Sequence, residues 1–227
     1  MSTRLATGGR LLDKDKAVSF SFNGKRLRGF AGDTLASALL ANDQMLVGRS
    51  FKYHRPRGIV ASGVEEPNAL VNLGVEGRFE PNQRATTTEL FDGLLATSQN
   101  HWPSLEFDVG AINAKLARFM PAGFYYKMFI HPRPLWKYVY EPFIRQAAGL
   151  GQAPKGRDQD TYEHFYAHCD VLIIGGGVAG LVAAKSAATS GARVIVLEQT
   201  PHWGGRAPVD GGTVDGKPVD KFVDELV

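Results

Sequence analysis

The chain has 227 residues, of which 44% are hydrophobic and 22% are charged, a composition ordinary for a folded globular protein and unlike a disordered one. Its formal net charge of +3 is small, which argues against nucleic acid as a partner but suits anionic ligands such as phosphates. Its one cysteine, Cys169, excludes a disulfide framework or an iron–sulfur site built from this chain. The histidines share no ligand spacing with acids, so we predict no metal site.

The N-terminus and the apolar stretches of the chain indicate no targeting or membrane segment. Residues 1–16 are polar and of mixed charge, without the apolar run of a signal peptide. The longest apolar stretch begins at 171–174, is interrupted by three glycines and is too short to span a bilayer. We therefore expect a cytoplasmic protein.

A β-hairpin is predicted near the start of the chain. Apolar residues alternate with polar ones over 18–22, Asn23-Gly24 follows directly, and apolar residues return over 27–30. Asn and Gly both tolerate the positive φ angles of a type I′ turn, so this pattern indicates two antiparallel strands joined by two residues.

A helix and two further strands are expected after the hairpin. Asp33 or Thr34 can accept hydrogen bonds from the free amides of the helix that follows them. Segments 69–73 and 84–90 are expected to be strands. A hairpin followed by a helix suits a small β-grasp domain, which we assign to residues 1–110.

The second region is predicted to be mainly helical. Apolar residues have helical spacing over 112–120, and 135–148 is a second helix candidate despite Pro142. An aromatic and apolar run, 124–130, lies between them. Gly, Gln, Pro and charged residues dominate 149–160, so we expect an irregular connection there.

The third region begins as a parallel α/β domain. A short apolar strand over 169–174 precedes an Ala-rich helix over 180–190 and a second apolar strand over 193–197. This order predicts the start of a Rossmann dinucleotide-binding domain in residues 166–227. Residues 111–165 then form a helical linker between the two domains.

A G-x-G-x-x-G motif over 175–180 joins the first of these strands to the helix, and Glu198 ends the second strand. In this context the motif is typical of dinucleotide binding. Gly175 would allow the tight turn, Gly177 the close approach of a diphosphate, and Gly180 the packing of helix on strand. The diphosphate would lie on the amides that begin the helix, and Glu198 would bind ribose hydroxyls and repel a 2′-phosphate, which favours NAD or FAD over NADP.

A second glycine pair, Gly204-Gly205, follows Glu198 and directly precedes Arg206. The spacing Glu-x5-Gly-Gly-Arg resembles that of flavoproteins with two dinucleotide-binding domains, the glutathione-reductase-like group. The resemblance implies that the glycines pass near the dinucleotide. Arg206 would either meet a phosphate or be a solvated side chain in a surface turn.

Two stretches of the first region carry a more specific resemblance. Residues 49–59 read Arg-Ser-Phe-Lys-Tyr-His-Arg-Pro-Arg-Gly-Ile, and residues 66–70 read Glu-Pro-Asn-Ala-Leu. With the glycine motif they resemble the alpha subunits of heterotetrameric sarcosine oxidases, and also those of opine oxidase and hydrogen cyanide synthase. The resemblance implies an α/β and α+β chain: a ferredoxin-like β-grasp domain without the cluster cysteines of some relatives, then the start of a Rossmann FAD- or NAD-binding domain.

The resemblance also implies an activity for the complete protein. Sarcosine would be oxidatively demethylated to glycine, dioxygen would become hydrogen peroxide, and the one-carbon unit would pass to tetrahydrofolate. FMN or FAD would lie in the full complex with beta, gamma and delta subunits, and the Rossmann unit would hold NAD as a structural cofactor. Because the rest of that domain and a folate-binding domain are missing, we expect a fragment that is inactive alone.

The cofactor contacts carried over by motif are Gly175, Gly177, Ala179, Gly180, Glu198, Gln199, Gly205 and Arg206. No catalytic acid, base or nucleophile stands out in the sequence. Two alternatives stay open: the alpha subunit of a related FAD-dependent opine, proline or glycine dehydrogenase, and a non-catalytic assembly module that holds a dinucleotide.

Overall fold

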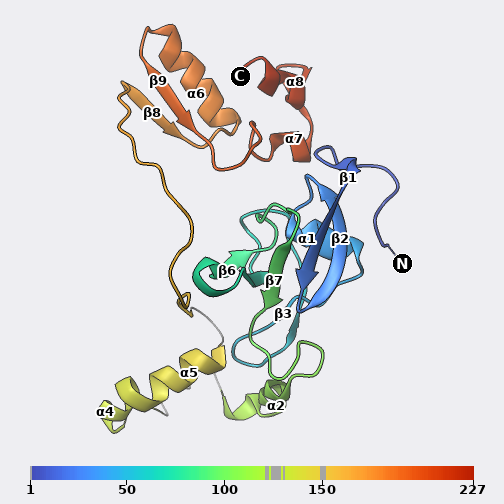
Figure 1. Cartoon of the computed structure of the whole chain (residues 1–227), viewed down its shortest axis with the longest axis vertical. Coiled ribbons are helices and arrows are strands. Elements are labelled where there is room, and N and C mark those ends of the chain that lie inside the picture. Colours follow the sequence, from blue (N-terminus) through green and yellow to red (C-terminus); the bar gives the residue numbers. More distant parts are fainter. Residues whose placement is uncertain (1, 121–122, 124–128, 130, 149–151) are drawn as a thin grey trace. The chain divides into compact units, whose positions relative to one another are not determined.

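Figure 1 shows the computed structural model, which describes residues 2–120, 123, 129, 131–148 and 152–227. The chain forms two compact units. The first comprises Met1–Ala6 and Leu12–Gln159, and the second comprises Thr7–Leu11 and Asp160–Val227.

The first unit is built on a five-stranded mixed sheet with the strand order β2-β1-β7-β5-β6. The strands are β1 (Asp13–Phe22), β2 (Lys25–Ala31), β5 (Leu70–Leu73), β6 (Glu80–Arg84) and β7 (Leu94–Ser98). β1 and β7 are parallel at the centre of the sheet, and the other neighbouring pairs are antiparallel. The ferredoxin-like β-grasp arrangement predicted for this region is confirmed. A separate short pair, β3 (Gly48–Arg49) and β4 (Pro56–Arg57), is also antiparallel.

The predicted hairpin joins β1 to β2. Asn23 has φ 49° and Gly24 has φ 78°, the two positive angles that a type I′ turn requires. Phe20 and Phe22 are buried, so the alternation in β1 turns its apolar side chains into the core.

Helix α1 (Leu35–Ala41) covers this core. Thr34 is its N-cap: the hydroxyl accepts from the Ser37 amide at 3.2 Å, and the Ser37 hydroxyl accepts from the Thr34 amide at 3.0 Å. Leu35 and Leu39 are fully buried among the strand side chains. Of the two predicted caps, Thr34 therefore holds the helix start.

The other candidate cap, Asp33, is buried and pairs with the beginning of the chain. Two nitrogens of the Arg4 guanidinium donate to its two carboxylate oxygens at 3.1 and 2.6 Å, and the Phe30 amide donates at 2.9 Å. The amide of Thr3 donates to the carbonyl oxygen of Ala41 at the end of α1. The first residues thus secure both ends of this helix.

The strand predicted over 84–90 is wrong beyond Arg84. β6 ends there, and the amides of Thr87 and Thr88 turn back to the Arg84 carbonyl oxygen at 3.1 Å each. Threonines favour strands through their branched side chains, but here their backbone closes a turn. β7 was not predicted; it is short, and its parallel pairing with β1 has no local sequence signal.

The helix predicted over 112–120 is present only in pieces. η2 (Val109–Ala111) leads into α2 (Ile112–Lys115), and η3 (Ala117–Phe119) follows. Leu116 interrupts the run with φ −90° and ψ 10°, outside regular helix.

The helix predicted over 135–148 is confirmed and begins slightly earlier. α4 (Arg133–Leu135), η4 (Trp136–Tyr140) and α5 (Glu141–Ala148) follow one another without a gap. η4 is a π-helical turn that ends two residues before Pro142, which has no amide hydrogen to donate to the preceding turn. Most of the predicted aromatic run, 124–130, lies outside the described residues.

The second unit contains the strand–helix–strand order of a Rossmann domain. β8 (Val171–Ile174) and β9 (Val194–Leu197) pair in parallel over four residues, and α6 (Val178–Thr189) connects them. Gly191, with φ 87°, follows the C-cap of α6 in the left-handed conformation. Four short elements follow: α7 (Ala207–Asp210), β10 (Thr213–Val214), β11 (Lys217–Pro218) and α8 (Val219–Asp224).

The connection between the units is irregular. No helix or strand is assigned over 152–169, and the contacts divide the units between Gln159 and Asp160. The domain boundaries at 110 and 165 stay predictions. Within the part of the chain that the structure describes, no helix has the length and apolar character needed to cross a bilayer.

Candidate functional site

The glycine-rich turn leads from β8 directly into α6 (Figure 1). Gly175 has φ 103°, and its amide donates to the carbonyl oxygen of Leu197 at 2.7 Å, which fastens the turn to β9. Gly177 is the N-cap residue of α6, with φ −67° and ψ 170°. The chain therefore passes from the end of the strand to the head of the helix within three residues, as the motif predicts.

The head of α6 is open beside Gly177. A Cβ built on Gly177 would have no heavy atom within 4 Å, and no side chain caps the helix. Amides of a first helical turn have no acceptor inside the helix, and the helix dipole is positive at this end. An anionic group such as a diphosphate fits these conditions.

Gly180 makes the turn and the helix pack closely. A Cβ at this position would lie 2.1 Å from the carbonyl oxygen of Gly175 and 3.3 Å from Cγ2 of Ile173. Only a residue without a side chain allows this distance. Ala179, in the same helical turn, is exposed.

Glu198 faces the turn from the end of β9. Its Oε2 accepts from the Gly176 amide at 2.7 Å, and its Oε1 accepts from the amide and the hydroxyl of Thr200, each at 2.9 Å. A carboxylate has about four acceptor positions, so Oε2 retains one for a further donor such as a ribose hydroxyl.

These contacts also fix the charge of Glu198. The hydrogen bond from the Thr200 amide, followed by that from Gly176, lowers the pKa of the carboxyl below its ordinary value, and desolvation opposes this only in part. The side chain is therefore ionised at neutral pH. An ionised acceptor suits ribose hydroxyls and repels a phosphate on the same sugar.

Three residues that hold the site were missed in the sequence analysis as supports: Thr200, Trp203 and Gly204. The Gly204 amide donates to the Gly176 carbonyl oxygen at 2.8 Å. A Cβ on Gly176 would lie 2.4 Å from the Trp203 ring, so the indole packs directly on the turn. Trp203 packs on backbone that only folding brings near, so no sequence spacing marks it. Thr200 holds the Glu198 carboxylate from two residues along the chain.

The remaining predicted contacts are Gly205, Arg206 and Gln199. Gly205 has φ 59°, and a Cβ there would lie 3.3 Å from the Gly177 Cα. Arg206 donates through Nη2 to Oδ1 of Asp210 at 2.8 Å in an exposed ion pair. Gln199 is exposed. The structure thus gathers the glycines and Glu198, while Arg206 is paired with Asp210.

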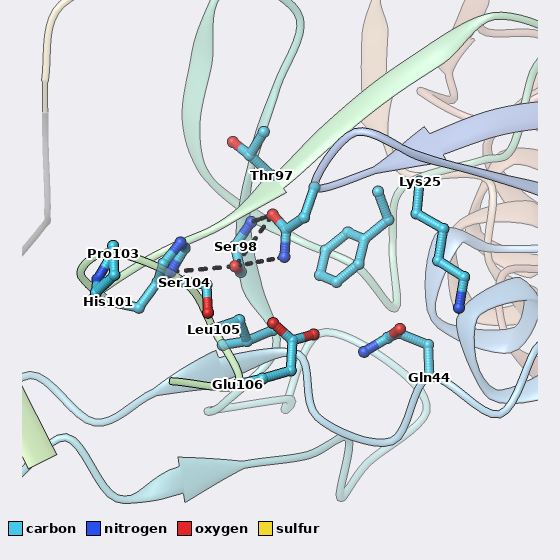
Figure 2. A pocket seen from close by; sticks show the side chains of 11 residues that line it. Lys25, Gln44, Thr97, Ser98, His101, Pro103, Ser104, Leu105 and Glu106 are labelled. Atoms are coloured by element: carbon cyan, nitrogen blue, oxygen red, sulfur yellow. Dashed lines mark hydrogen bonds between the residues drawn. The ribbon is translucent and has the colours of Figure 1, made fainter. Parts of the chain in front are cut away.

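The first unit carries a pocket of about 380 Å³, lined by both polar and apolar side chains, beside the end of β7 (Figure 2). Two of its polar residues bond one another: Nδ2 of Asn23 donates to Oγ of Ser98, and the Ser98 amide donates to Oδ1 of Asn23, both at 2.8 Å. These bonds hold the hairpin turn against β7. We assign no ligand to the pocket. Its other charged or amide lining residues are Lys25, Gln44 and Glu106.

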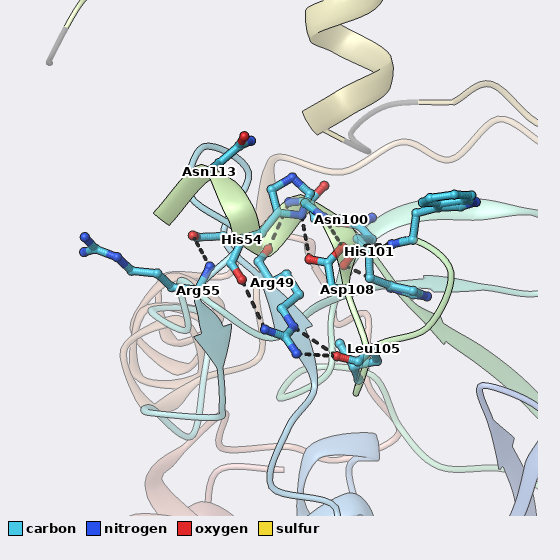
Figure 3. A network of polar contacts seen from close by, with 12 residues as sticks. Arg49, His54, Arg55, Asn100, His101, Leu105, Asp108 and Asn113 are labelled. Atoms are coloured by element: carbon cyan, nitrogen blue, oxygen red, sulfur yellow. Dashed lines mark hydrogen bonds and ion pairs between the residues drawn. The ribbon is translucent and has the colours of Figure 1, made fainter. Parts of the chain in front are cut away.

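A second polar network shapes the loop after β7 (Figure 3). Nδ1 of His54 lies 2.7 Å from Oδ2 of Asp108, and both side chains are almost fully buried. The Arg49 guanidinium donates to the Leu105 carbonyl oxygen at 3.0 and 2.7 Å. Arg49 and His54 belong to the 49–59 stretch that carried the family resemblance, so that stretch acts here by positioning this loop.

Comparison with known protein families gives the class of protein to which each part of the chain is similar. Residues 15–101 match the family described as "2Fe-2S iron-sulfur cluster binding domain", and residues 170–223 match "FAD dependent oxidoreductase". The chain therefore combines a ferredoxin-like domain with the start of an FAD-type oxidoreductase domain.

Relatives that match nearly the whole chain include sarcosine oxidase alpha subunits. The chain is 56% identical over 97% of its length to that of Rhizobium meliloti (strain 1021), of which it covers 22%. It is 32% identical over 97% of its length to that of Corynebacterium sp. (strain U-96), of which it covers 18%. The chain is thus homologous to the N-terminal portion of sarcosine oxidase alpha subunits, as predicted, and spans about a fifth of their length.

A solved structure, that of L-proline dehydrogenase from P. horikoshii, aligns with 96% of this chain and 33% of its own, with a TM-score of 0.47 and 21% identity. A likeness at this level carries no argument about function.

The residues of the first unit do not fit a [2Fe–2S] cluster. Such clusters are held by four cysteine thiolates, or by two cysteines and two histidines. Residues 15–101 contain no cysteine. Among the described residues, no group of three or more His, Cys, Asp or Glu side chains is arranged to hold a metal ion. We therefore derive no reaction step through a cluster.

Proposed function

We propose that the second unit binds the ADP portion of a dinucleotide, NAD or else FAD, at the turn between β8 and α6. The observation that carries the proposal is the Gly176–Glu198 hydrogen bond, which holds an ionised acceptor beside the open head of α6. The diphosphate would lie on the amides that begin α6, and Glu198 would bind the ribose hydroxyls.

The other residues have supporting parts in this proposal. Gly175 and Gly180 shape the turn, Gly177 leaves room for the diphosphate, and Gly205 lets the following chain pass close by. Arg206 would exchange Asp210 for a phosphate oxygen. The proposed contacts are Gly175, Gly177, Ala179, Gly180, Glu198, Gln199, Gly205 and Arg206.

For the complete protein we propose the activity of a sarcosine oxidase: oxidative demethylation of sarcosine to glycine, with peroxide formation and transfer of the one-carbon unit to tetrahydrofolate. The 56% identity to a sarcosine oxidase alpha subunit supports this assignment. The dinucleotide on this chain would be structural, and FMN or FAD would supply the redox chemistry in a cytoplasmic complex with beta, gamma and delta subunits. This chain would contribute binding and assembly, and would be inactive alone.

One alternative is favoured by a specific observation. The match of residues 170–223 to FAD-dependent oxidoreductases suits FAD, rather than NAD, in the Rossmann site. The complete protein would then be a related dehydrogenase that acts on an opine, proline or glycine.

The binding proposal is tested by calorimetric titration of the chain with NAD, FAD, NADP and AMP. We expect NAD or FAD to bind, AMP to bind more weakly, and NADP to bind least because of Glu198. Equal binding of NADP and NAD, or no binding of any of the four, would overturn the proposed site.

The activity proposal needs the complete complex. The complex is purified with its partner subunits, its nucleotide is extracted with acid and identified, and peroxide is measured with sarcosine, proline and an opine as substrates. NAD together with sarcosine-dependent peroxide supports the sarcosine oxidase. FAD with turnover of another amine supports the alternative, and turnover of none of them would leave an assembly module.

A further inference from the structure

A second glutamate, Glu66, organises the backbone of the first unit from inside. Only 1% of the surface of Glu66 is exposed to solvent. Its Oε2 accepts from the amides of Val60 at 2.8 Å and Ala61 at 2.7 Å, and its Oε1 accepts from those of Asn68 at 2.7 Å and Ala69 at 3.1 Å. The loop over residues 60–69 therefore closes around a single carboxylate.

The hydrogen-bond donors to this carboxylate are neutral backbone groups. Four bonds match its about four acceptor positions, so the carboxylate is saturated. Burial raises the pKa of Glu66, and the four amide hydrogen bonds together lower it by more, so that it stays below its ordinary value. The loop thus contains an internal anion at neutral pH.

This anion occupies a segment that in other proteins holds a metal cluster. Plant-type cluster thiolates have the spacing C-x4-C-x2-C, with a fourth later in the chain. Ala61, Glu66 and Ala69 have this spacing within the segment that matches the iron–sulfur family. The buried Thr86, later in the chain, donates its hydroxyl to the Gly63 carbonyl oxygen at 2.7 Å. The loop is thus held together by hydrogen bonds at Ala61, Glu66 and Ala69, the positions with the cluster spacing, and by Thr86 later in the chain.

We propose that Glu66 takes over the structural role of the cluster in this chain. Clusters are anionic and accept hydrogen bonds on their sulfurs, and the carboxylate supplies the same two properties with one side chain. The first unit would then keep its ferredoxin-like fold without an electron carrier. It follows that the four amides form an anion-binding nest that any small carboxylate can fill once the Glu66 side chain is removed.

The test is Glu66→Ala in the 227-residue chain, with Glu80→Ala as the matched control because Glu80 is an exposed glutamate on the edge strand of the same sheet. Urea unfolding is followed by near-ultraviolet circular dichroism in sodium formate and in sodium chloride of equal ionic strength. We expect Glu66→Ala to lower the folded-to-unfolded ratio at least about tenfold, because four buried amides lose their acceptor.

Formate decides whether the loss is specific. We expect formate, relative to chloride, to raise the unfolding midpoint of Glu66→Ala and not that of Glu80→Ala or of the unsubstituted chain. If Glu66→Ala folds only when refolded in formate, the proposal is equally supported. An equal response of all three proteins to formate, or a Glu66→Ala midpoint equal to that of Glu80→Ala, would overturn it.

Glu66→Gln tests the role of the charge independently, because glutamine leaves no cavity in the loop. Glutamine has nearly the same shape, but its NH2 group would face two amide donors, so we expect a loss of stability close to that of Glu66→Ala and no rescue by formate. A Glu66→Gln chain as stable as the unsubstituted one would show that shape alone suffices, and the internal anion would be abandoned.

Discussion

The loop over 60–69 and the turn over 175–177 both bring backbone amides onto a glutamate, yet the two carboxylates differ in what they leave unused. Glu66 is buried and accepts four amides, whereas Glu198 is partly exposed, accepts three hydrogen bonds and lies beside an uncapped helix. A buried carboxylate whose acceptor positions are all occupied can only stabilise its own loop. A carboxylate with a free acceptor position beside an open helix start can also bind a ligand. The number of free acceptor positions therefore distinguishes a structural anion from a binding group.

The largest difference between the two loops is expected for a substitution at Gly180. In Gly180→Ala the new Cβ would lie 2.1 Å from the Gly175 carbonyl oxygen, so the turn must move. We expect nucleotide binding to fall below detection by calorimetry and the second unit to lose about 1–3 kcal/mol of unfolding free energy. Hydrogen exchange of the 60–69 amides should not change. Faster exchange of these amides in Gly180→Ala would contradict the view that the 60–69 loop and the 175–177 turn are organised independently.

Gly177→Ala separates binding from folding. The backbone angle φ −67° suits alanine and nothing lies within 4 Å of the new methyl, so we expect the unfolding free energy to stay within about 0.5 kcal/mol. The methyl would occupy the side from which the diphosphate approaches, so affinity should fall at least about tenfold, measured by calorimetry. Unchanged affinity would mean that the ligand lies elsewhere.

Glu198→Gln sharpens the contrast with Glu66→Gln. The amide side chain keeps one acceptor oxygen at a partly exposed position, so we expect a smaller loss of stability than at Glu66. Removal of one charge-assisted hydrogen bond to ribose should weaken NAD binding about tenfold, and the discrimination against NADP should decrease. If NADP is rejected as strongly as before, the charge of Glu198 is not what excludes it.

The smallest effect is expected in acid. Folding lowers the pKa of both glutamates below the ordinary value of about 4.5, so each contributes stability that is complete above that value and is lost as the pH falls through the folded pKa. Unfolding free energies between pH 7 and pH 3 should therefore fall less steeply in Glu66→Ala than in the unsubstituted chain. Asp13, Asp210 and Glu225 shift in the same direction, so only the difference between variants is informative.

Features determined by neighbouring residues could be predicted from the sequence. The Asn23-Gly24 turn, helix α6 and the turn at Gly175 depend on backbone angles that those residues favour, and each was predicted within a few positions. The strand over 84–90 failed because its threonines close a turn, and β7 was missed because its pairing with β1 is long-range.

The parts of the candidate site that act through backbone could not be predicted. Thr200 and Trp203 support Glu198 and Gly176 by contacts that appear only after the chain has folded. Glu66 was noticed only as part of a family pattern, because a carboxylate that binds four amides leaves no periodicity or spacing of its own. Backbone donors are common to every residue, so the sequence does not show which of them converge.

The pairing of Arg4 with Asp33 has a practical consequence for anyone who shortens this protein. A version that starts at β1 would retain the aspartate in the interior while discarding the only guanidinium shown to neutralise it among the described residues. Such a version would fold poorly for reasons unrelated to its sheet, because an uncompensated interior charge is strongly destabilising. A shortened version should therefore begin at or before Ser2, so that Arg4 is retained.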